Sequence, residues 1–178
     1  MVKTLILLMI AMIFFVVSCG GINTGKDIGD TGNTQADVDN DTGDTGDNFP
    51  NEHDGLNWSN ASYNRTWDEA VEYCKNLGGR LPTISELRTL IQNCPATETG
   101  GECGVTDSCL SYTDCRTDPC IGCEENMSGK YSVFGDTELL WSSLERSDNT
   151  NNVWRVYFDY GLVDDSGKNA YTRVRCVE

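Results

Sequence analysis

Cysteine content constrains this chain more than any other feature. Nine of its 178 residues are cysteines, and eight of the nine lie between positions 74 and 176. The chain opens with Lys3, an apolar run over 5–17 and small residues near position 20, an order typical of a secretion signal. Because an even number of cysteines in an exported chain indicates disulfide bonds, we expect these eight to be paired. The eight are Cys74, Cys94, Cys103, Cys109, Cys115, Cys120, Cys123 and Cys176.

The apolar run ends at Val16-Val17-Ser18-Cys19, which resembles the lipobox of bacterial lipoproteins. The run is shorter than the roughly 20 residues that a membrane-spanning helix needs. The resemblance implies that residues 1–18 are a signal peptide, removed before Cys19, and that Cys19 carries acyl chains, which together anchor a protein firmly. The residue after Cys19 is Gly20 rather than Asp. In a host with two membranes, the lipoprotein pattern then implies sorting to the outer membrane. We therefore expect lipid anchoring at the cell outer membrane or cell surface; an ordinary secretion signal with a chance cysteine is the alternative.

The composition of residues 19–54 predicts a disordered acidic tether. From position 20 to 54 there are nine acidic residues and one lysine, and Asp-Thr-Gly recurs at 30–32, 41–43 and 44–46. Such a segment cannot bury a core and has a span of roughly 30 to 35 Å. Asp37, Asp39 and Asp41 alternate as calcium ligands do in an EF-hand loop, but the glycine and glutamate that such a loop requires are missing. A solvated spacer is the favoured interpretation, and calcium binding is the alternative.

Residues 55–178 have the size of one domain. They carry 19 acidic and 11 basic residues, so their net charge is −8. Nucleic-acid binding needs a basic surface to displace counterions from phosphates, and this charge disfavours it.

Two helices are predicted by their start signals. Thr66-Trp67-Asp68-Glu69 forms a capping box ahead of an apolar stripe that includes Val71 and Cys74, and Gly78-Gly79 ends that helix. Thr83-Ile84-Ser85-Glu86 forms a second capping box, followed by an apolar face that ends at Cys94.

The last third of the domain predicts strands instead. Apolar and aromatic residues alternate with polar ones from Trp154 to Tyr160, and shorter runs at 139–143, 162–164 and 171–177 have strand character. In the last run we expect Arg173 and Arg175 to face outward, near Asp159, on a charged sheet face.

These segments together resemble the Lcl C-terminal domain family over about 56–178. The resemblance is carried by the runs Trp67 to Cys74, Gly79 to Leu87, Trp141-Ser142-Ser143, Trp154 to Gly161 and Val174 to Val177. It implies an α+β, C-type-lectin-like fold with two helices and a short twisted antiparallel sheet, in which the two ends of the domain lie together. It also implies an exported domain used for surface binding or adhesion. The run Arg80-Leu81-Pro82-Thr83 is also similar to formylglycine-generating and other sulfatase-modifying enzymes.

The resemblance also implies a disulfide between Cys74 and Cys176. The other six cysteines would then hold an insert, residues 95–130, whose sequence has little apolar periodicity to order it. Cys115, Cys120 and Cys123 have a spacing seen in iron–sulfur proteins, and a zinc site or a redox pair of Cys120 with Cys123 are further alternatives. Structural disulfides are favoured, because an exported chain would have to acquire such a cluster outside the cell.

Little in the sequence predicts catalysis. The single histidine, His53, lies in or beside the tether, so a Ser-His-Asp site is not expected. Asp164 and Asp165 are neighbours on a predicted strand and point to opposite faces, and Glu124-Glu125 is most simply solvated surface. The Glu-Pro-Asn, Gln-Pro-Asp and Trp-Asn-Asp triplets of calcium-dependent lectins are missing. We therefore expect no metal and no cofactor.

The sequence thus predicts a lipid-anchored, non-catalytic binding or adhesion module. Its expected partners are the membrane, through the lipid, and an extracellular glycan or protein. A structural envelope lipoprotein without a ligand is one alternative, and an enzyme related to the sulfatase-modifying group is a weaker one. The aromatic residues to test as ligand contacts are Trp58, Tyr112, Tyr131 and Tyr157.

Overall fold

A computed structural model of the chain describes residues 48–123 and 129–178. The described residues belong to one compact unit. The predicted signal peptide, the predicted lipidation site Cys19, the Asp37–Asp41 repeat and Glu124-Glu125 lie outside the described residues. Within the described ranges, no helix has the length and apolar character needed to cross a bilayer.

Both predicted helices form and both begin at their capping boxes, but the second ends at Thr89 and does not reach Cys94 as its apolar pattern had predicted. Helix α1 spans Trp67–Asn76 after the cap Thr66, and α2 spans Ile84–Thr89 after the cap Thr83. At each cap a glutamate three residues on accepts a hydrogen bond from the backbone N–H of the cap residue, which satisfies a donor that the helix leaves open. Two short helices follow in the insert: α3, Tyr112–Cys115, and the 3-10 helix η1, Asp118–Ile121.

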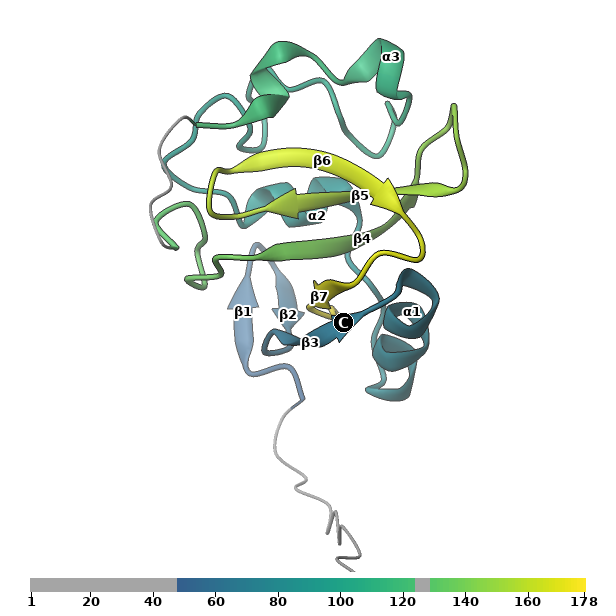
Figure 1. The fold of residues 1–178 in the computed structure, drawn as a ribbon. Coiled ribbons are helices and arrows are strands. Elements are labelled where there is room, and N and C mark those ends of the chain that lie inside the picture. The colour runs from purple at the N-terminus through teal and green to yellow at the C-terminus, as the bar shows by residue number, and fades with distance from the viewer. Residues whose placement is uncertain (1–47, 124–128) are drawn as a thin grey trace, which may run out of the picture. The chain divides into compact units, whose positions relative to one another are not determined.

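A five-stranded mixed sheet forms the centre of the domain (Figure 1). Its order is β3-β7-β4-β5-β6. The sheet is not wholly antiparallel as the resemblance had implied, because β4 and β7 are parallel while the other neighbours are antiparallel. The alternation that predicted a strand near Trp154 is confirmed by β5, which ends at Tyr157. The strand bounds are β3 Ser62–Arg65, β4 Leu139–Glu145, β5 Asn152–Tyr157, β6 Leu162–Gly167 and β7 Thr172–Val174.

The folded part begins before Gly55, where the sequence had suggested the tether would end. Strands β1, Asn51–His53, and β2, Leu56–Trp58, form an antiparallel hairpin. Its turn is Asp54-Gly55, and both residues have positive φ, as a two-residue hairpin turn requires. Phe49 is buried, and Trp58 bridges Val177, so the start of the described chain meets its C-terminus. The acidic composition of residues 20–54 concealed this hairpin.

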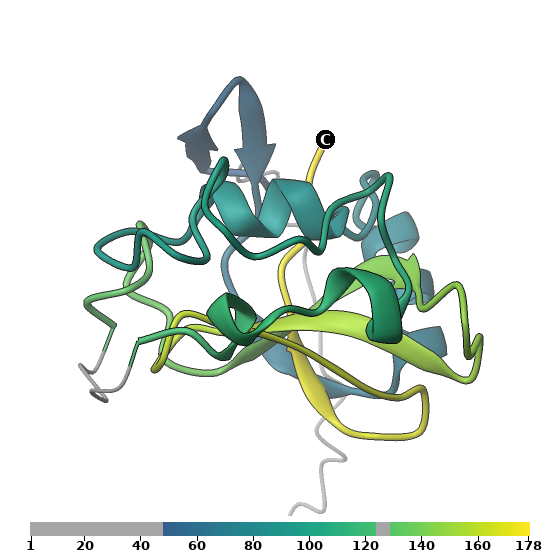
Figure 2. The same cartoon turned by 90° about the horizontal axis from the view of Figure 1, so that it is seen from above.

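Two hydrophobic cores lie on opposite faces of the sheet. One packs α2 and the insert against β4, β5 and β6, and Figure 2 shows α2 on one side of these strands. The other packs α1 against β7 and β4, around Ala70, Trp141 and Val174. Val71 was predicted in the buried stripe of α1, but it is 40% exposed because α1 turns its Ala70 and Cys74 side toward the sheet.

All eight cysteines of the domain are paired. Cys74 of α1 is joined to Cys176 after β7, across a sequence separation of 102 residues. Closing so long a loop contributes about 4 to 5 kcal/mol in the chain-entropy model. The other three disulfides are Cys94–Cys123, Cys103–Cys120 and Cys109–Cys115. Since Cys120 and Cys123 each bond elsewhere, they do not form a redox pair with each other.

A buried arginine ties α2 to the insert. The Arg88 side chain is 3% exposed, and its guanidinium donates hydrogen bonds to the backbone carbonyls of Thr97, Glu98 and Val105. These bonds offset the cost of burying a charge, and they hold a segment that has few apolar side chains of its own.

Candidate ligand-binding site

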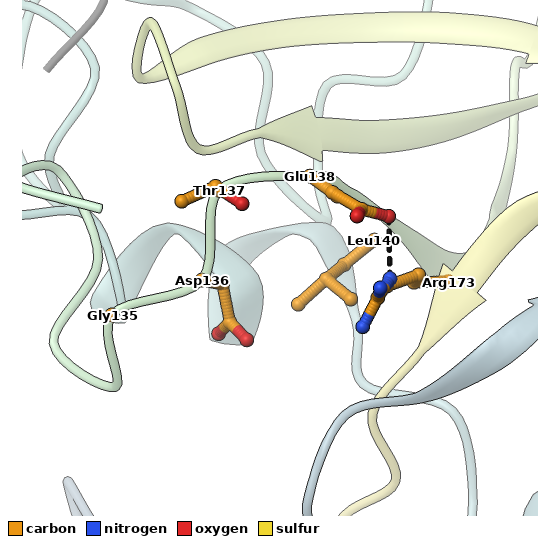
Figure 3. A pocket seen from close by; sticks show the side chains of 6 residues that line it. All are labelled: Gly135, Asp136, Thr137, Glu138, Leu140 and Arg173. Carbon is orange, nitrogen blue, oxygen red and sulfur yellow. Dashed lines mark hydrogen bonds and ion pairs between the residues drawn. The ribbon is translucent and has the colours of Figure 1, made fainter. Parts of the chain in front are cut away.

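Two adjoining hollows lie where β4 begins, beside β7. The first, of about 150 Å³, is lined by Gly135, Asp136, Thr137, Glu138, Leu140 and Arg173. The second, of about 180 Å³, is lined by Asn64, Glu138, Leu139, Tyr157, Tyr171, Thr172 and Arg173. Glu138 and Arg173 line both, so we call the combined surface the Glu138–Arg173 site. Figure 3 shows the first hollow, with Arg173 and Asp136 on either side of Leu140.

A buried ion pair fixes the loop that enters this site. The guanidinium of Arg175 donates two hydrogen bonds of 2.9 Å to the carboxylate of Asp136, and both side chains are less than a tenth exposed. Ser132 also donates to Asp136, and the Arg175 guanidinium lies 4.8 Å from the Phe134 ring centre. The ion pair therefore links the loop ahead of β4 to the segment after β7.

A second ion pair, between Glu138 and Arg173, lies at the centre of the site and is open to solvent. Both side chains keep more than two fifths of their surface exposed. The sequence predicted Arg173 and Arg175 as one outward pair near Asp159. Instead, Arg173 pairs with Glu138 at the surface, and Arg175 turns inward to Asp136, because β7 ends at Val174 and the chain no longer alternates.

Two tyrosines and an asparagine complete the second hollow. Tyr171 is 69% exposed, and Tyr157 lies 5.3 Å from Tyr160, ring centre to ring centre. Burial raises the pKa of the Tyr157 phenol, and the carboxylates of Asp159 and Glu138 raise it further. The phenol therefore stays protonated and can donate a hydrogen bond over the whole physiological pH range.

The site combines exposed aromatic faces with planar polar groups. Tyr171 offers a ring for stacking, while Asn64, Glu138 and Arg173 offer donors and acceptors at fixed positions. Because the Glu138 charge offsets the Arg173 charge and Asp136 is matched by Arg175, the site carries little net charge. Such a surface can hold a polar ligand by hydrogen bonds and ring contact, without activating a nucleophile.

Of the four aromatic residues predicted as ligand contacts, Tyr157 lies in this site. Trp58 and Tyr131 are 0% and 4% exposed and pack in the core with α2, so neither can meet a ligand from the surface.

Tyr112, the fourth candidate, lies away from the site. Its ring stacks on Trp154 at 6.4 Å, and the guanidinium groups of Arg146 and Arg116 lie over it at 4.5 and 5.2 Å. Tyr112 remains 37% exposed, and these contacts attach α3 to the sheet.

Sequence reasoning missed most of the residues that build the site. Asp136 and Glu138 come from a loop with no motif, and Tyr171 was taken as the first residue of a strand. Arg173 was correctly predicted at the surface. Its expected exposure was the one feature of the sequence that could have indicated this site.

The residues weighed for catalysis do not converge. His53 Nε2 lies 2.9 Å from the carbonyl oxygen of Thr89. Asp164 and Asp165 bind different arginines, Arg155 and Arg146. Among the residues that the structure describes, no three His, Cys, Asp or Glu side chains come together as a metal site would require.

Comparison with known proteins gives one result. A family model described as the Lcl C-terminal domain matches residues 48–178. Among curated proteins, no significant match is found.

Proposed function

Because the chain belongs to the Lcl C-terminal domain family, we propose that it is a surface-anchored lipoprotein that displays a non-catalytic binding or adhesion module. The observation that carries the proposal is the Glu138–Arg173 site, in which exposed aromatic and paired polar side chains gather at one place on the domain. We further propose that the domain is C-type-lectin-like. Its meeting chain ends, its two main helices and the Cys74–Cys176 disulfide support that assignment.

Several features favour binding over catalysis. The carboxylates of the site are each matched by an arginine, so neither is poised as a general base. The Arg80–Thr83 run that is similar to sulfatase-modifying enzymes has a structural role here. Arg80 pairs with Glu86 at 2.7 Å, and its backbone N–H donates to Val177.

The order of the chain favours display at a surface. The lipobox-like run ends at Cys19, the acidic segment follows, and the disulfide-rich domain comes last. A lipid on Cys19 would anchor the protein at the outer membrane or cell surface, and like charges in the tether would extend it. A disulfide-bonded domain suits an oxidising compartment outside the cytoplasm.

The proposed partner is an extracellular glycan or protein. The near-neutral Glu138–Arg173 site and the net negative domain disfavour nucleic acids and strongly anionic polymers. A neutral saccharide or a polar protein surface would suit a tyrosine face flanked by planar hydrogen-bonding groups.

A glycan and protein array probed with the chain from Cys19 onward tests the proposal. The probe carries Cys19→Ser, so that no lipid causes retention. We expect a ligand that the unaltered domain retains and the double variant Glu138→Gln/Arg173→Gln does not. Failure of the folded domain to retain any ligand would contradict a binding role and favour a structural envelope protein.

A further inference from the structure

Another hollow, distinct from the two that form the Glu138–Arg173 site, lies along α1. It has a volume of about 470 Å³, within the range of small-molecule sites. Three of its lining residues are Trp67, Val71 and Lys75, which lie four residues apart and so share one face of the helix. The remaining lining residues are Gly79, Arg80, Leu81, Thr83 and Ser143. We call this surface the α1 hollow.

The apolar side of the α1 hollow is not covered by the described fold. Val71 is 40% exposed although it lies in the middle of a helix whose neighbouring face is fully buried. Leu81, which is 2% exposed, forms the apolar floor, and Trp67 is held in place by a 2.9 Å hydrogen bond from its indole N–H to the carbonyl of Ser142. The hollow therefore has a fixed shape and an apolar interior.

Two basic residues, Lys75 and Arg80, line the hollow, in a domain whose net charge is −8. Within the described ranges, Lys75 takes part in no ion pair, whereas the charge of Arg80 is matched by Glu86. The acidic residues of α1, Asp68, Glu69 and Glu72, line a different hollow on the adjacent face. A negatively charged group at the rim would thus meet the Lys75 ammonium without a competing carboxylate from this face of α1.

The backbone of the hollow has few donors left for an extended peptide. The N–H groups of Gly79 and Arg80 donate to the carbonyls of Cys74 and Val177, and that of Ser143 donates to Pro82. The N–H of Thr83 is bound by the Glu86 carboxylate. Peptides that add along a protein edge rely on such main-chain groups, so a small molecule fits better.

We propose that the α1 hollow binds a small apolar carboxylate. Its hydrocarbon part packs on Trp67, Val71 and Leu81, and its carboxylate pairs with Lys75. This site is separate from the Glu138–Arg173 site and does not depend on the function proposed there.

Titration with octanoate, below its micelle concentration, tests the proposal on the Cys19→Ser chain from position 19 onward. Nuclear magnetic resonance would follow the Trp67 indole N–H and the Val71 methyl groups. We expect both to shift with octanoate, and octylammonium, which has the same chain and the opposite charge, to bind at least tenfold more weakly.

Variants of α1 separate a ligand role of Lys75 from a role in capping the helix. Lys75→Met keeps the length of the side chain and removes its charge, and we expect it to weaken octanoate binding at least tenfold. Glu72→Gln, which changes a charge on the adjacent face, serves as the matched control and should bind octanoate as the parent does. Equal binding of octanoate by the parent and the Lys75→Met variant would overturn the proposal. So would equal binding of octylammonium, or no shift of Trp67 and Val71.

Discussion

Asp136 and Glu138 lie two positions apart, and each pairs with an arginine near the end of the chain. The Asp136–Arg175 pair is less than a tenth exposed, whereas the Glu138–Arg173 pair is more than two fifths exposed. Burial changes what an ion pair contributes, because removing one member of a buried pair leaves the other charge without water or a partner. An exposed pair is screened by solvent and contributes little. We therefore assign Asp136 to holding the loop and Glu138 to meeting the ligand.

Neutralising each carboxylate tests this division. Asp136→Asn should lower the free energy of unfolding by about 3 kcal/mol or more, because Arg175 stays buried without a counter-charge. Glu138→Gln, the matched control, should change it by less than about 1 kcal/mol. Urea unfolding followed by tryptophan fluorescence measures both. A similar loss in the two variants would contradict the assignment.

The elements with the clearest local signals were the ones that the sequence predicted well. Capping boxes at Thr66 and Thr83 placed two helix starts, because cap side chains act within four residues. The β1–β2 hairpin was missed although Asp54-Gly55 is a strong turn signal, since its short strands lie at the end of an acidic segment.

The candidate site was harder to predict than the helices. Glu138 and Arg173 are 35 positions apart, and they meet through the pairing of β4 with β7. That pairing depends on the whole sheet, so no local pattern reveals it. Burial of Trp58 and Tyr131 depends on the same long-range packing, which is why the sequence left both residues open as candidates for ligand contact.

The attachment of α3 should depend on pH through Asp148. A hydrogen bond from Arg146 holds the pKa of the Asp148 carboxyl at about 2, and the backbone N–H of Tyr112 contributes to the shift. Since this pKa is lower in the folded chain, the carboxylate stabilises the fold above its ordinary pKa of 3.8, and this contribution is lost as the pH falls through about 2.

A carboxyl titration by nuclear magnetic resonance measures this pKa. We expect a midpoint of about 2 for Asp148 in the parent chain. The variant Arg146→Met should move it toward 3.8, the ordinary value. Lys168→Met removes a cation that pairs with Glu145 instead, and should leave the Asp148 midpoint unchanged. An unshifted midpoint in the parent would contradict the proposed attachment.

At the scale of the whole molecule, we propose an anchor, a spacer and a binding domain in that order along the chain. Four disulfides and two hydrophobic cores hold the domain together. Net negative charge on both the tether and the domain would keep the domain away from acidic surfaces and lengthen its reach.

Mass spectrometry of the protein purified from membranes tests the anchor. We expect the chain to begin at Cys19 and to carry acyl groups on that residue. Cys19→Ala should prevent acylation and release the protein from the membrane fraction, whereas Ser18→Ala, a neighbouring change that keeps the cysteine, should not. A membrane-bound Cys19→Ala variant would contradict lipid anchoring.

The central claim is that the Glu138–Arg173 site binds a ligand, and calorimetric titration tests it most directly. The ligand selected on the array would be titrated into the parent chain and two tyrosine variants. Tyr171→Ala removes an aromatic face of the site, while Tyr63→Ala removes a tyrosine that is 85% exposed and does not line it. We predict at least a tenfold weaker affinity for Tyr171→Ala and an unchanged affinity for Tyr63→Ala; equal affinities in all three proteins would contradict the claim.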